Sequence, residues 1–284
     1  NHSKFEKIKL INLHEYNDLD NYDLSKFSGF CFDNLLNLNK KQLIIFNNLK
    51  KIKLNYLDII DWSILNFHYI PPKIIKYSNR KLIFLNPKKT SFDIRLKRIG
   101  DITLSFLILI ITLPIVIVAI ILIKIEDQGP IFYKQKRNGL NSREFIILKL
   151  RSMKINAEDN GPKWTNSQDS RVTKIGKFLR RSRIDELPQL FSVIQGKMSL
   201  IGPRPEREEF DKNFRKDIPF YDNRYNIKPG LSGWAQVNYP YGASQKDAEN
   251  KLGYDLYYIF NFSFLLDLLI LFKTFKLVFN REGS

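Results

Sequence analysis

The chain has 284 residues, enough for one large domain or two ordinary ones with a full apolar core. Hydrophobic residues make up 44% of it and charged residues 26%, a composition that excludes a disordered tail. Lys and Arg number 46 against 29 Asp and Glu, which gives a formal charge of +17. That excess predicts a polyanionic partner, either nucleic acid, anionic lipid or a phosphorylated substrate.

Residues 1–90 are predicted to form a small α/β domain. Short apolar runs alternate there with Asn, Asp and Lys, and Gly29 is the only glycine, so no phosphate-binding glycine loop is present. We interpret this region as an accessory domain with a packing or regulatory role.

Residues 102–123 carry no charged side chain and are long enough to cross a bilayer. Basic residues flank both ends, so the flanks favour neither orientation. Pro114 lies near the middle, where it removes a backbone hydrogen bond and favours a kink. We interpret the segment as a re-entrant helix–break–helix hairpin that enters and leaves by one face, and a single kinked span is the alternative.

The rest of the chain, residues 91–284, is expected to form a mixed α/β (α+β) domain attached to the membrane by this segment. Its last stretch, residues 254–279, is rich in Leu, Phe and Tyr but is interrupted by Asp267, Lys273 and Lys276. Such a pattern predicts either a helix in the headgroup plane or a buried core helix.

Cysteine and histidine are too scarce for several common chemistries. Cys31 is the single cysteine, so no internal disulfide and no cysteine metal cluster can form, which fits a reducing compartment. The three histidines are His2, His14 and His68. A Ser-His-Asp hydrolase or a His-ligated zinc site is therefore excluded after residue 68.

A short helix is predicted to begin near two adjacent carboxylates, Asp185 and Glu186. Apolar residues follow them at helical spacing, Pro188 is tolerated only in a first turn, and Gly196 is a plausible end. Backbone N–H groups point outward at such a helix start, which suits phosphate. The alternative is that Asp185 merely caps the helix and Glu186 interacts with its dipole.

Basic residues are predicted to surround these carboxylates. Arg180, Arg181 and Arg183 come just before them. Arg204 lies between two prolines, which reduces the entropy lost when its guanidinium binds an anion. Lys149 and Arg151 alternate in a predicted strand and would share one face. With the membrane segment, they outline a phosphate-binding site near the bilayer surface.

A phosphoryl-transfer site needs a nucleophile and neutralised charge. Because neither His nor Cys follows residue 68, Asp185 is the candidate nucleophile. Glu186 is the candidate metal ligand, since Mg²⁺ is a hard ion that takes carboxylate and phosphate oxygens.

Five motifs carry a resemblance to a known family. In unbroken order over residues 95–280, the chain resembles the monotopic polyprenol-phosphate phosphoglycosyl transferases, also called the bacterial sugar transferase family. The family's proline break commonly has Ser before it, where this chain has Leu113 with Thr112 as the nearest hydroxyl. The motifs are KRIGD (97–101), GPIFYKQKRNG (129–139), FIILKLRSM (145–153), RRSRIDELPQLFSVIQGKMSLIGPRPE (180–206) and KPGLSGWAQVN (228–238).

The resemblance implies an enzyme of the inner (cytoplasmic) membrane, with a re-entrant helix that leaves the catalytic domain and residues 1–90 in the cytosol. It would transfer a sugar 1-phosphate from a UDP-sugar to undecaprenyl phosphate with Mg²⁺ and release UMP. This reaction starts a lipid-linked glycan such as an exopolysaccharide or O-antigen unit. Longer members carry spanning helices before the accessory domain, and whether this chain is a fragment of such a protein stays open.

The resemblance also implies roles for single residues. Asp185 would attack the β-phosphate and form a covalent phosphosugar, and Glu186 would be its dyad partner and a Mg²⁺ ligand. Arg204 would contact the nucleotide. Arg181, together with Lys149 or Arg151, would neutralise phosphates.

Two other classes of function are weighed against this enzyme. One is a non-catalytic basic scaffold at the membrane surface, and the other is a protein that binds anionic lipid or nucleic acid. No nucleic-acid-binding module is recognisable, so no nucleic acid is expected as a partner. The sugar and the oligomeric state, a homo-oligomer included, stay open, and turnover of a UDP-sugar separates the classes.

Overall fold

The structure is a computed structural model. It describes residues 29–32, 40–51, 55–75, 90–157, 169–240, 242 and 244–279. Before residue 76 the elements are β1 (Gly29–Phe32), α1 (Lys40–Lys51), β2 (Asn55–Asp58), α2 (Ile59–Phe67) and α3 (Pro72–Ile75). After residue 89 they are α5 (Ser91–Asp127), β3 (Phe132–Asn138), η5 (Leu140–Ser142), β4 (Glu144–Leu150), α6 (Lys174–Arg181), η6 (Ile184–Gln189), α7 (Leu190–Ile194), β5 (Ser199–Ile201), α8 (Glu208–Asp217), η7 (Tyr221–Asn226), β6 (Gly230–Ser232), α9 (Trp234–Asn238), α10 (Gln245–Asn261) and α11 (Phe264–Phe279), where η marks a 3₁₀-helix.

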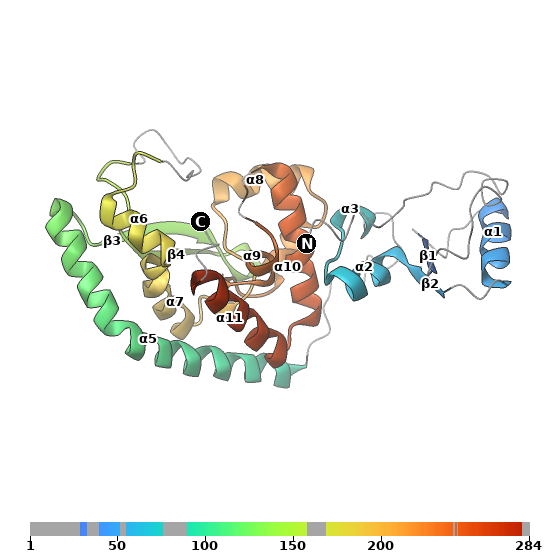
Figure 1. The fold of residues 1–284 in the computed structure, drawn as a ribbon, viewed down its shortest axis with the longest axis horizontal. Coiled ribbons are helices and arrows are strands. Elements are labelled where there is room, and N and C mark those ends of the chain that lie inside the picture. The colour runs from blue at the N-terminus through green and yellow to red at the C-terminus, as the bar shows by residue number, and fades with distance from the viewer. Residues whose placement is uncertain are drawn as a thin grey trace.

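Helices dominate this fold, and the described strands pair only two by two. β1 pairs with β2 in parallel, β3 with β4 antiparallel, and β5 with β6 in parallel. β1, α1 and β2 lie at one end of the molecule, away from α5 (Figure 1). The mixed α/β class expected from the sequence is therefore confirmed, in a form rich in helices.

The apolar segment lies inside α5, a helix of 37 residues and about 55 Å at 1.5 Å per residue. Thr90 and Asp93 form a capping box at its start, and Gln128 ends it in the left-handed conformation. An 18-residue window of α5 has a mean hydropathy of 3.4 and is only 11% buried. Among the described helices, α5 alone is long and apolar enough to cross a membrane.

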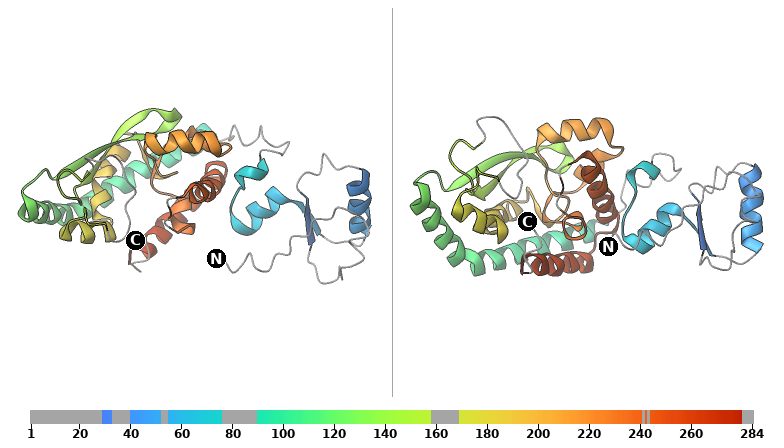
Figure 2. Two further views of the ribbon diagram at one scale, coloured as in Figure 1. Left: turned by 90° about the horizontal axis from the view of Figure 1, so that it is seen from above. Right: turned by 45° about the horizontal axis from the view of Figure 1, so that its top comes forward.

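Pro114 does not interrupt α5, which is helical from end to end. The helix is curved instead, and α6 and α7 lie inside the curve (Figures 1 and 2). Thr112 Oγ1 donates a 2.7 Å hydrogen bond to the carbonyl of Ile108. Because such a bond to the preceding turn bends a helix, Thr112 adds to the effect of the proline. The expected break into two helices is thus a bend in one helix.

Both halves of α5 pack against the same domain. In the first half, Leu104 and Ile108 pack on a core cluster that contains Leu190 and Val193 of α7. In the second half, Ala119 and Ile123 are buried in a cluster that reaches α6 and β4. The domain therefore lies along one side of the whole helix.

Polar side chains of the KRIGD motif attach the first half of α5 to its neighbours. Lys97 pairs with Asp267 of α11 at 2.7 Å. Arg98 donates to the carbonyls of Val193 and Ile194 at the end of α7, at 2.6 and 2.8 Å. Arg98 therefore caps the end of α7, where the Val193 carbonyl also accepts a 2.9 Å hydrogen bond from the backbone N–H of Gly196.

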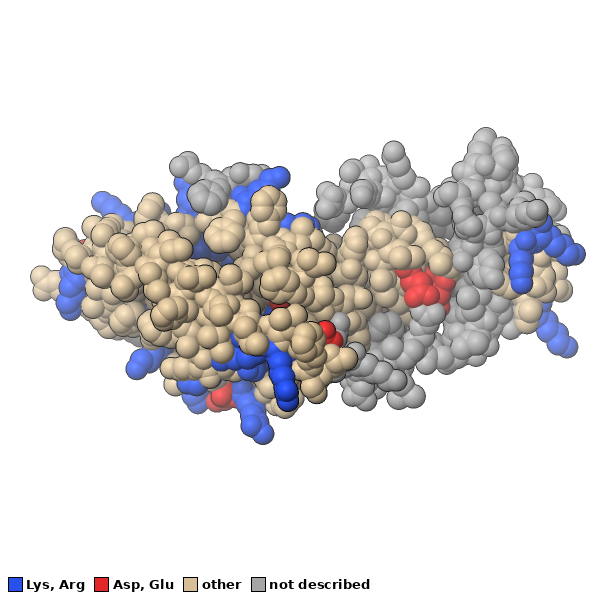
Figure 3. Space-filling view, turned by 90° about the horizontal axis from the view of Figure 1, so that it is seen from below, with Lys and Arg blue, Asp and Glu red and all other residues tan. Residues whose placement is uncertain are grey.

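Residues 254–279 form the end of α10 and the whole of α11. α11 has features of both predicted alternatives, a buried core helix and a helix in the headgroup plane. Ile270 is fully buried on one side of α11, whereas Leu265 is 77% exposed and Phe272 is 69% exposed on the other. α11 lies beside α5 (Figure 1), and seen from below the molecule presents a broad face of uncharged residues with Lys and Arg mostly near its edges (Figure 3). The helix is therefore a core helix on one side and an apolar surface on the other.

The segment before α5 contributes to the core of the following domain. Ile60 of α2, Ile70 just before α3, and Ile75 of α3 are fully buried against residues of α8, η7 and α10. Tyr69 lies so close to Gly253 of α10 that a Cβ there would come within 2.1 Å of its ring. The boundary predicted near residue 90 thus cuts through one core, since α2 and α3 pack with the later residues.

Candidate active site

The two carboxylates lie on η6, at a sharp change of chain direction. Arg183 precedes η6 in the left-handed conformation, with φ at 55°. η6 carries Asp185, Glu186 and Pro188 and leads directly into α7, and Gly196 follows α7 with φ at 82°. The helix predicted to begin near Asp185 is confirmed, but its first turn is a 3₁₀-helix. Asp185 lies inside that turn, so it is not the cap residue.

Glu186 is the centre of a cluster of basic side chains. Its Oε1 accepts hydrogen bonds from Lys149 Nζ of β4 at 2.8 Å and from Arg204 Nη2 at 2.6 Å. Its Oε2 lies 3.4 Å from Arg204 Nη1 and 3.9 Å from Arg183 Nη1. Burial alone would raise the pKa of Glu186, but Arg204 and Lys149 outweigh it and hold the pKa well below its usual range. Glu186 is therefore a permanent anion.

Asp185 differs from Glu186 both in its contacts and in the direction of its pKa shift. Its side chain is buried, with 6% of the residue exposed, and within the part of the chain that the structure describes no hydrogen bond or ion pair reaches its carboxylate. Burial, with a further contribution from Glu186, raises the pKa of Asp185 to about 6, although Lys149, Arg180 and Arg204 oppose the shift. An unpaired, poorly solvated carboxylate beside a fixed one has the properties expected of a candidate nucleophile.

Two apolar neighbours fix the carboxylates against α5. Ile184 packs on the cluster that contains Ala119 and Ile123, beyond Pro114. Leu187 packs on the cluster that also receives the first half of α5. The residues on either side of the dyad thus pack in two different clusters to which α5 also contributes, and η6 lies against α5.

The structure brings together some of the predicted site residues and not others. Lys149 and Arg204 both contact Glu186, as expected of a shared site. Arg151 does not join them, because β4 ends at Leu150 and the Arg151 guanidinium pairs with Asp127 at the end of α5. Arg181 is exposed at the end of α6.

Arg180 and Arg183 act on the dyad directly, whereas the resemblance gives the phosphate-binding role to Arg181. Arg183 lies 3.9 Å from Glu186, and the charge of Arg180 lowers the pKa of Asp185. The run of basic residues before the dyad was visible in the sequence. Which of them turns inward depends on the end of α6 and on the left-handed residue that follows it.

The donor set at the dyad can accept a divalent ion. Oε1 of Glu186 is occupied by two short hydrogen bonds, but Oε2 has only the longer contacts described above, and Asp185 has an open carboxylate. In the described part of the chain, no cluster of three or more His, Cys, Asp or Glu could hold a metal by itself. A Mg²⁺ ion here would need substrate phosphate oxygens and water to complete its coordination shell, as is usual for Mg²⁺ in proteins.

Comparison with known proteins identifies the family that the region around the dyad resembles. The family model described as "Bacterial sugar transferase" matches residues 92–281. The UDP-N-acetylgalactosamine-undecaprenyl-phosphate N-acetylgalactosaminephosphotransferase of Aeromonas hydrophila is 44% identical over 66% of this chain and 45% of its own length. The UDP-glucose:undecaprenyl-phosphate glucose-1-phosphate transferases of Klebsiella pneumoniae and Escherichia coli K12 are 40% and 38% identical, over 66% and 63% of this chain.

The matched region covers only part of each relative. The chain spans less than half of the length of these three proteins, 45%, 41% and 39% respectively. The match nevertheless contains the whole of the site, from the KRIGD motif of α5 through the dyad to α11. The chain belongs to the bacterial sugar transferase family.

Proposed function

We propose that this protein is a phosphoglycosyl transferase that moves a sugar 1-phosphate from a UDP-sugar to undecaprenyl phosphate and releases UMP, the first step of a lipid-linked glycan. The observation that carries the proposal is the contrast within the dyad. Glu186 is held by Lys149 and Arg204, whereas Asp185 is buried, unpaired and has a pKa near 6. The names of the relatives from Aeromonas and Klebsiella give them this type of reaction.

In the first step, a carboxylate oxygen of Asp185 attacks the β-phosphorus of the UDP-sugar. A bond forms between that oxygen and phosphorus, and the bond from phosphorus to the bridging oxygen breaks, so UMP leaves with the bridging oxygen. Lys149, Arg183 and Arg204 neutralise the charge on the phosphates, which would otherwise repel a carboxylate nucleophile.

In the second step, an oxygen of undecaprenyl phosphate attacks the same phosphorus. The bond between phosphorus and Asp185 breaks, so the lipid diphosphate sugar leaves and the carboxylate is restored. Because η6, which carries the dyad, lies against the apolar helix α5, we expect the lipid phosphate to reach it from the membrane surface.

We include Mg²⁺ in the proposal, with Glu186 Oε2 as its protein ligand. When bound, the ion would supply further neutralisation of the donor's diphosphate. The longer contacts of this oxygen leave it more accessible than Oε1, which supports the assignment.

We also propose that α5 is re-entrant and that the protein lies on the cytosolic face of the inner membrane. Both halves of α5 pack on one domain, whereas a straight span would leave its second half across the bilayer from that domain. The apolar side of α11 beside α5 supports the same placement, since it can insert among the headgroups. The segment from α2 to α3 is on the same side, because it shares a core with α10.

Topology is tested by labelling two thiols. Cys31 is exposed and reports on the N-terminal side, and Lys136→Cys on β3 reports on the chain after α5, where the side chain of Lys136 is 75% exposed. A membrane-impermeant reagent should label both in inside-out vesicles and neither in intact spheroplasts. Labelling of the two positions from opposite sides would contradict the re-entrant topology.

The reaction is tested by screening UDP-sugars for UMP release, with undecaprenyl phosphate, Mg²⁺ and the full chain in lipid nanodiscs. At least one donor should be turned over, and Asp185→Asn should release no UMP. If the unaltered protein turns over no donor, the proposed activity is wrong and a scaffold role is the better interpretation.

A further inference from the structure

The loop that carries Arg204 belongs to no helix or strand, yet its backbone is held at every residue. Pro203 and Pro205 have no backbone N–H group, so hydrogen bonds can hold the main chain there only through carbonyls. Four consecutive carbonyls do accept hydrogen bonds from other parts of the domain. The bonds run from Gly230 N to Pro203, from Arg224 Nη2 to Arg204, from Arg137 Nη1 to Pro205 and from Asn138 N to Glu206, at 2.9, 2.9, 3.3 and 3.3 Å respectively.

Arg224 of η7 is the side chain that holds the backbone of Arg204 itself. Only 6% of Arg224 is exposed, and its guanidinium has further partners. Its Nη1 donates to the hydroxyl of Tyr221 at 2.6 Å, and its Nη2 also donates to Asp255 of α10 at 3.1 Å. A planar guanidinium with three acceptors has little freedom to move, so it can fix the position of the main chain that it contacts.

Arg204 connects this buried arginine to the dyad. The carbonyl of Arg204 accepts from Arg224, and the guanidinium of Arg204 donates to Glu186 at 2.6 Å. The positive charge of Arg204 lowers the pKa of both Glu186 and Asp185. A displacement of the main chain at Arg204 would therefore change the electrostatic surroundings of both carboxylates.

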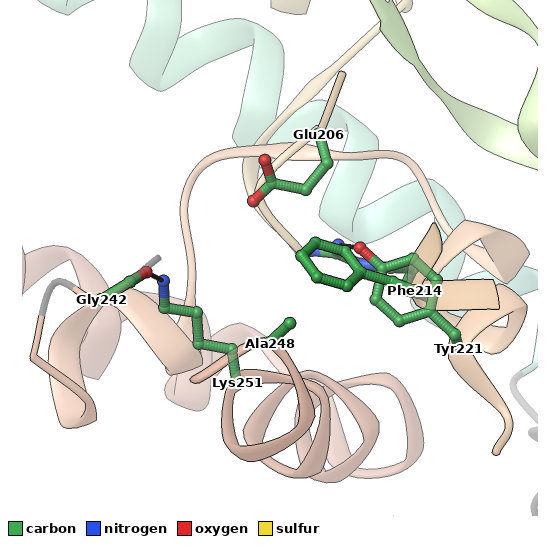
Figure 4. Close-up of a pocket in the computed structure, with 7 residues that line it drawn as sticks. Glu206, Phe214, Tyr221, Gly242, Ala248 and Lys251 are labelled. Carbon is green, nitrogen blue, oxygen red and sulfur yellow. Dashed lines mark hydrogen bonds between the residues drawn. The ribbon is translucent and has the colours of Figure 1, made fainter. Parts of the chain in front are cut away.

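Arg224 does not border a space that a substrate could enter. Figure 4 shows the hollow that it helps to line, with Glu206, Phe214 and Lys251 around it. This hollow has room for about one water molecule. Any effect of Arg224 on the reaction must therefore pass through the residues that it holds.

We propose that Arg224 is a positioning residue, which holds the backbone at Arg204 so that the Arg204 guanidinium meets Glu186. The kinetic part of this inference rests on the proposed function. Tyr221 and Asp255 act one step farther away, because they fix the guanidinium of Arg224. Without this hold, the Arg204 guanidinium should move away from Glu186, whereas Lys149 should still pair with Glu186 and keep it ionised.

The first test replaces Arg224 with lysine and measures UMP release against pH. Lysine keeps a positive charge beside Asp255 but lacks the fork that reaches three acceptors at once. Arg224→Lys should lower kcat/KM about 10-fold. Its acid limb should also move to higher pH, because Asp185 loses the effect of Arg204 while the charges of Glu186, Lys149 and Arg180 stay near it.

Tyr225→Phe is the matched control for a purely structural effect. It removes a buried hydrogen bond from the Tyr225 hydroxyl to Asp211, also within this core, but leaves the contacts of Arg224 with Arg204 in place. It should lower the thermal stability of the protein without moving the acid limb. If Arg224→Lys does not fold, Tyr221→Phe takes its place, since it removes one bond to Arg224 without changing a charge. Its acid limb should move in the same direction by a smaller amount.

A double variant shows whether Arg224 acts through Arg204. Once Arg204→Lys has removed the guanidinium, adding Arg224→Lys should lower kcat/KM by less than about 2-fold further. A second loss of about 10-fold would show that Arg224 acts independently, and this would overturn the inference. An unchanged kcat/KM and acid limb in a folded Arg224→Lys variant, or an unmoved limb in Tyr221→Phe, would overturn it as well.

A measurement without turnover separates this inference from the proposed reaction. Because a higher pKa of Asp185 costs more stability at pH 8, the stabilisation by Asp185→Asn at that pH should be larger in the Arg224→Lys background than in the unaltered protein. Thermal unfolding of the four proteins gives both values. Equal stabilisation in the two backgrounds contradicts the role of Arg224, whereas a failure to turn over any UDP-sugar contradicts only the proposed reaction.

Discussion

Arg204 Nη2 donates a 2.6 Å hydrogen bond to Glu186 Oε1 across 18 positions of sequence. This contact joins a loop fixed by two prolines to the 3₁₀ turn that carries the proposed nucleophile. It keeps Glu186 ionised, and the charge of Glu186 in turn helps to raise the pKa of its neighbour Asp185. The pKa of Asp185 therefore depends on the ion pairs that keep Glu186 charged.

Replacing Arg204 with lysine should reduce kcat/KM for the UDP-sugar by about 10-fold or more. Lysine keeps the positive charge but cannot make the paired contacts of a guanidinium with both oxygens of Glu186. Steady-state UMP release gives the result. An activity equal to that of the unaltered protein would show that the paired geometry is not needed.

Activity should fall at acid pH as Asp185 takes up a proton. Because the pKa of Asp185 is about 6 and the proposed nucleophile is its ionised form, kcat/KM should rise tenfold per pH unit below 6 and level off above it. Lys149 lowers this pKa, so Lys149→Gln should move the acid limb to higher pH as well as slow the reaction. If the acid limb of the kcat/KM profile does not move in this variant, Lys149 does not influence the pKa of Asp185.

The unpaired carboxylate should also reduce the stability of the fold. Asp185 keeps its proton up to about pH 6 when folded, against an ordinary value of 3.8, so the free energy of unfolding falls as pH rises between these values. Asp185→Asn carries no charge and should be more stable than the unaltered protein at pH 8, by on the order of 2–3 kcal/mol. Thermal unfolding at pH 8 and pH 4 measures this, and the advantage should vanish at pH 4.

Arg183 and Arg181 offer a direct comparison of an inward and an exposed arginine. Arg183 lies 3.9 Å from Glu186, whereas Arg181 is exposed at the end of α6. Arg183→Ala should lower kcat/KM by about 10-fold, and Arg181→Ala should lower it far less. The opposite order would show that the exposed residue binds a substrate phosphate, as the family resemblance implies for Arg181.

The sequence predicted the local features of this site well. Helical spacing after Glu186, with Pro188 and Gly196 as limits, predicted where the turn begins and ends. Strand alternation brought Lys149 to the site, and the two prolines around Arg204 correctly indicated an immobilised guanidinium. These features depend on neighbours in sequence, which is why a pattern can predict them.

The sequence pattern could not predict features that depend on contacts between residues far apart in the chain. Arg151 follows the last residue of β4 and meets Asp127 from the end of α5, so strand alternation does not apply to it. Pro114 bends α5 without breaking it, because the helix packs on one domain along both halves. The burial of Ile70 against α10 likewise needs the three-dimensional fold.

The most direct measurement is the mass of the protein after incubation with its UDP-sugar in the absence of lipid phosphate. A sugar phosphate adduct should form and map to the peptide that contains Asp185, and undecaprenyl phosphate should remove it. Asp185→Asn should gain no mass under the same conditions. Release of UMP without any adduct, or an adduct on another residue, would contradict the account of a covalent transferase.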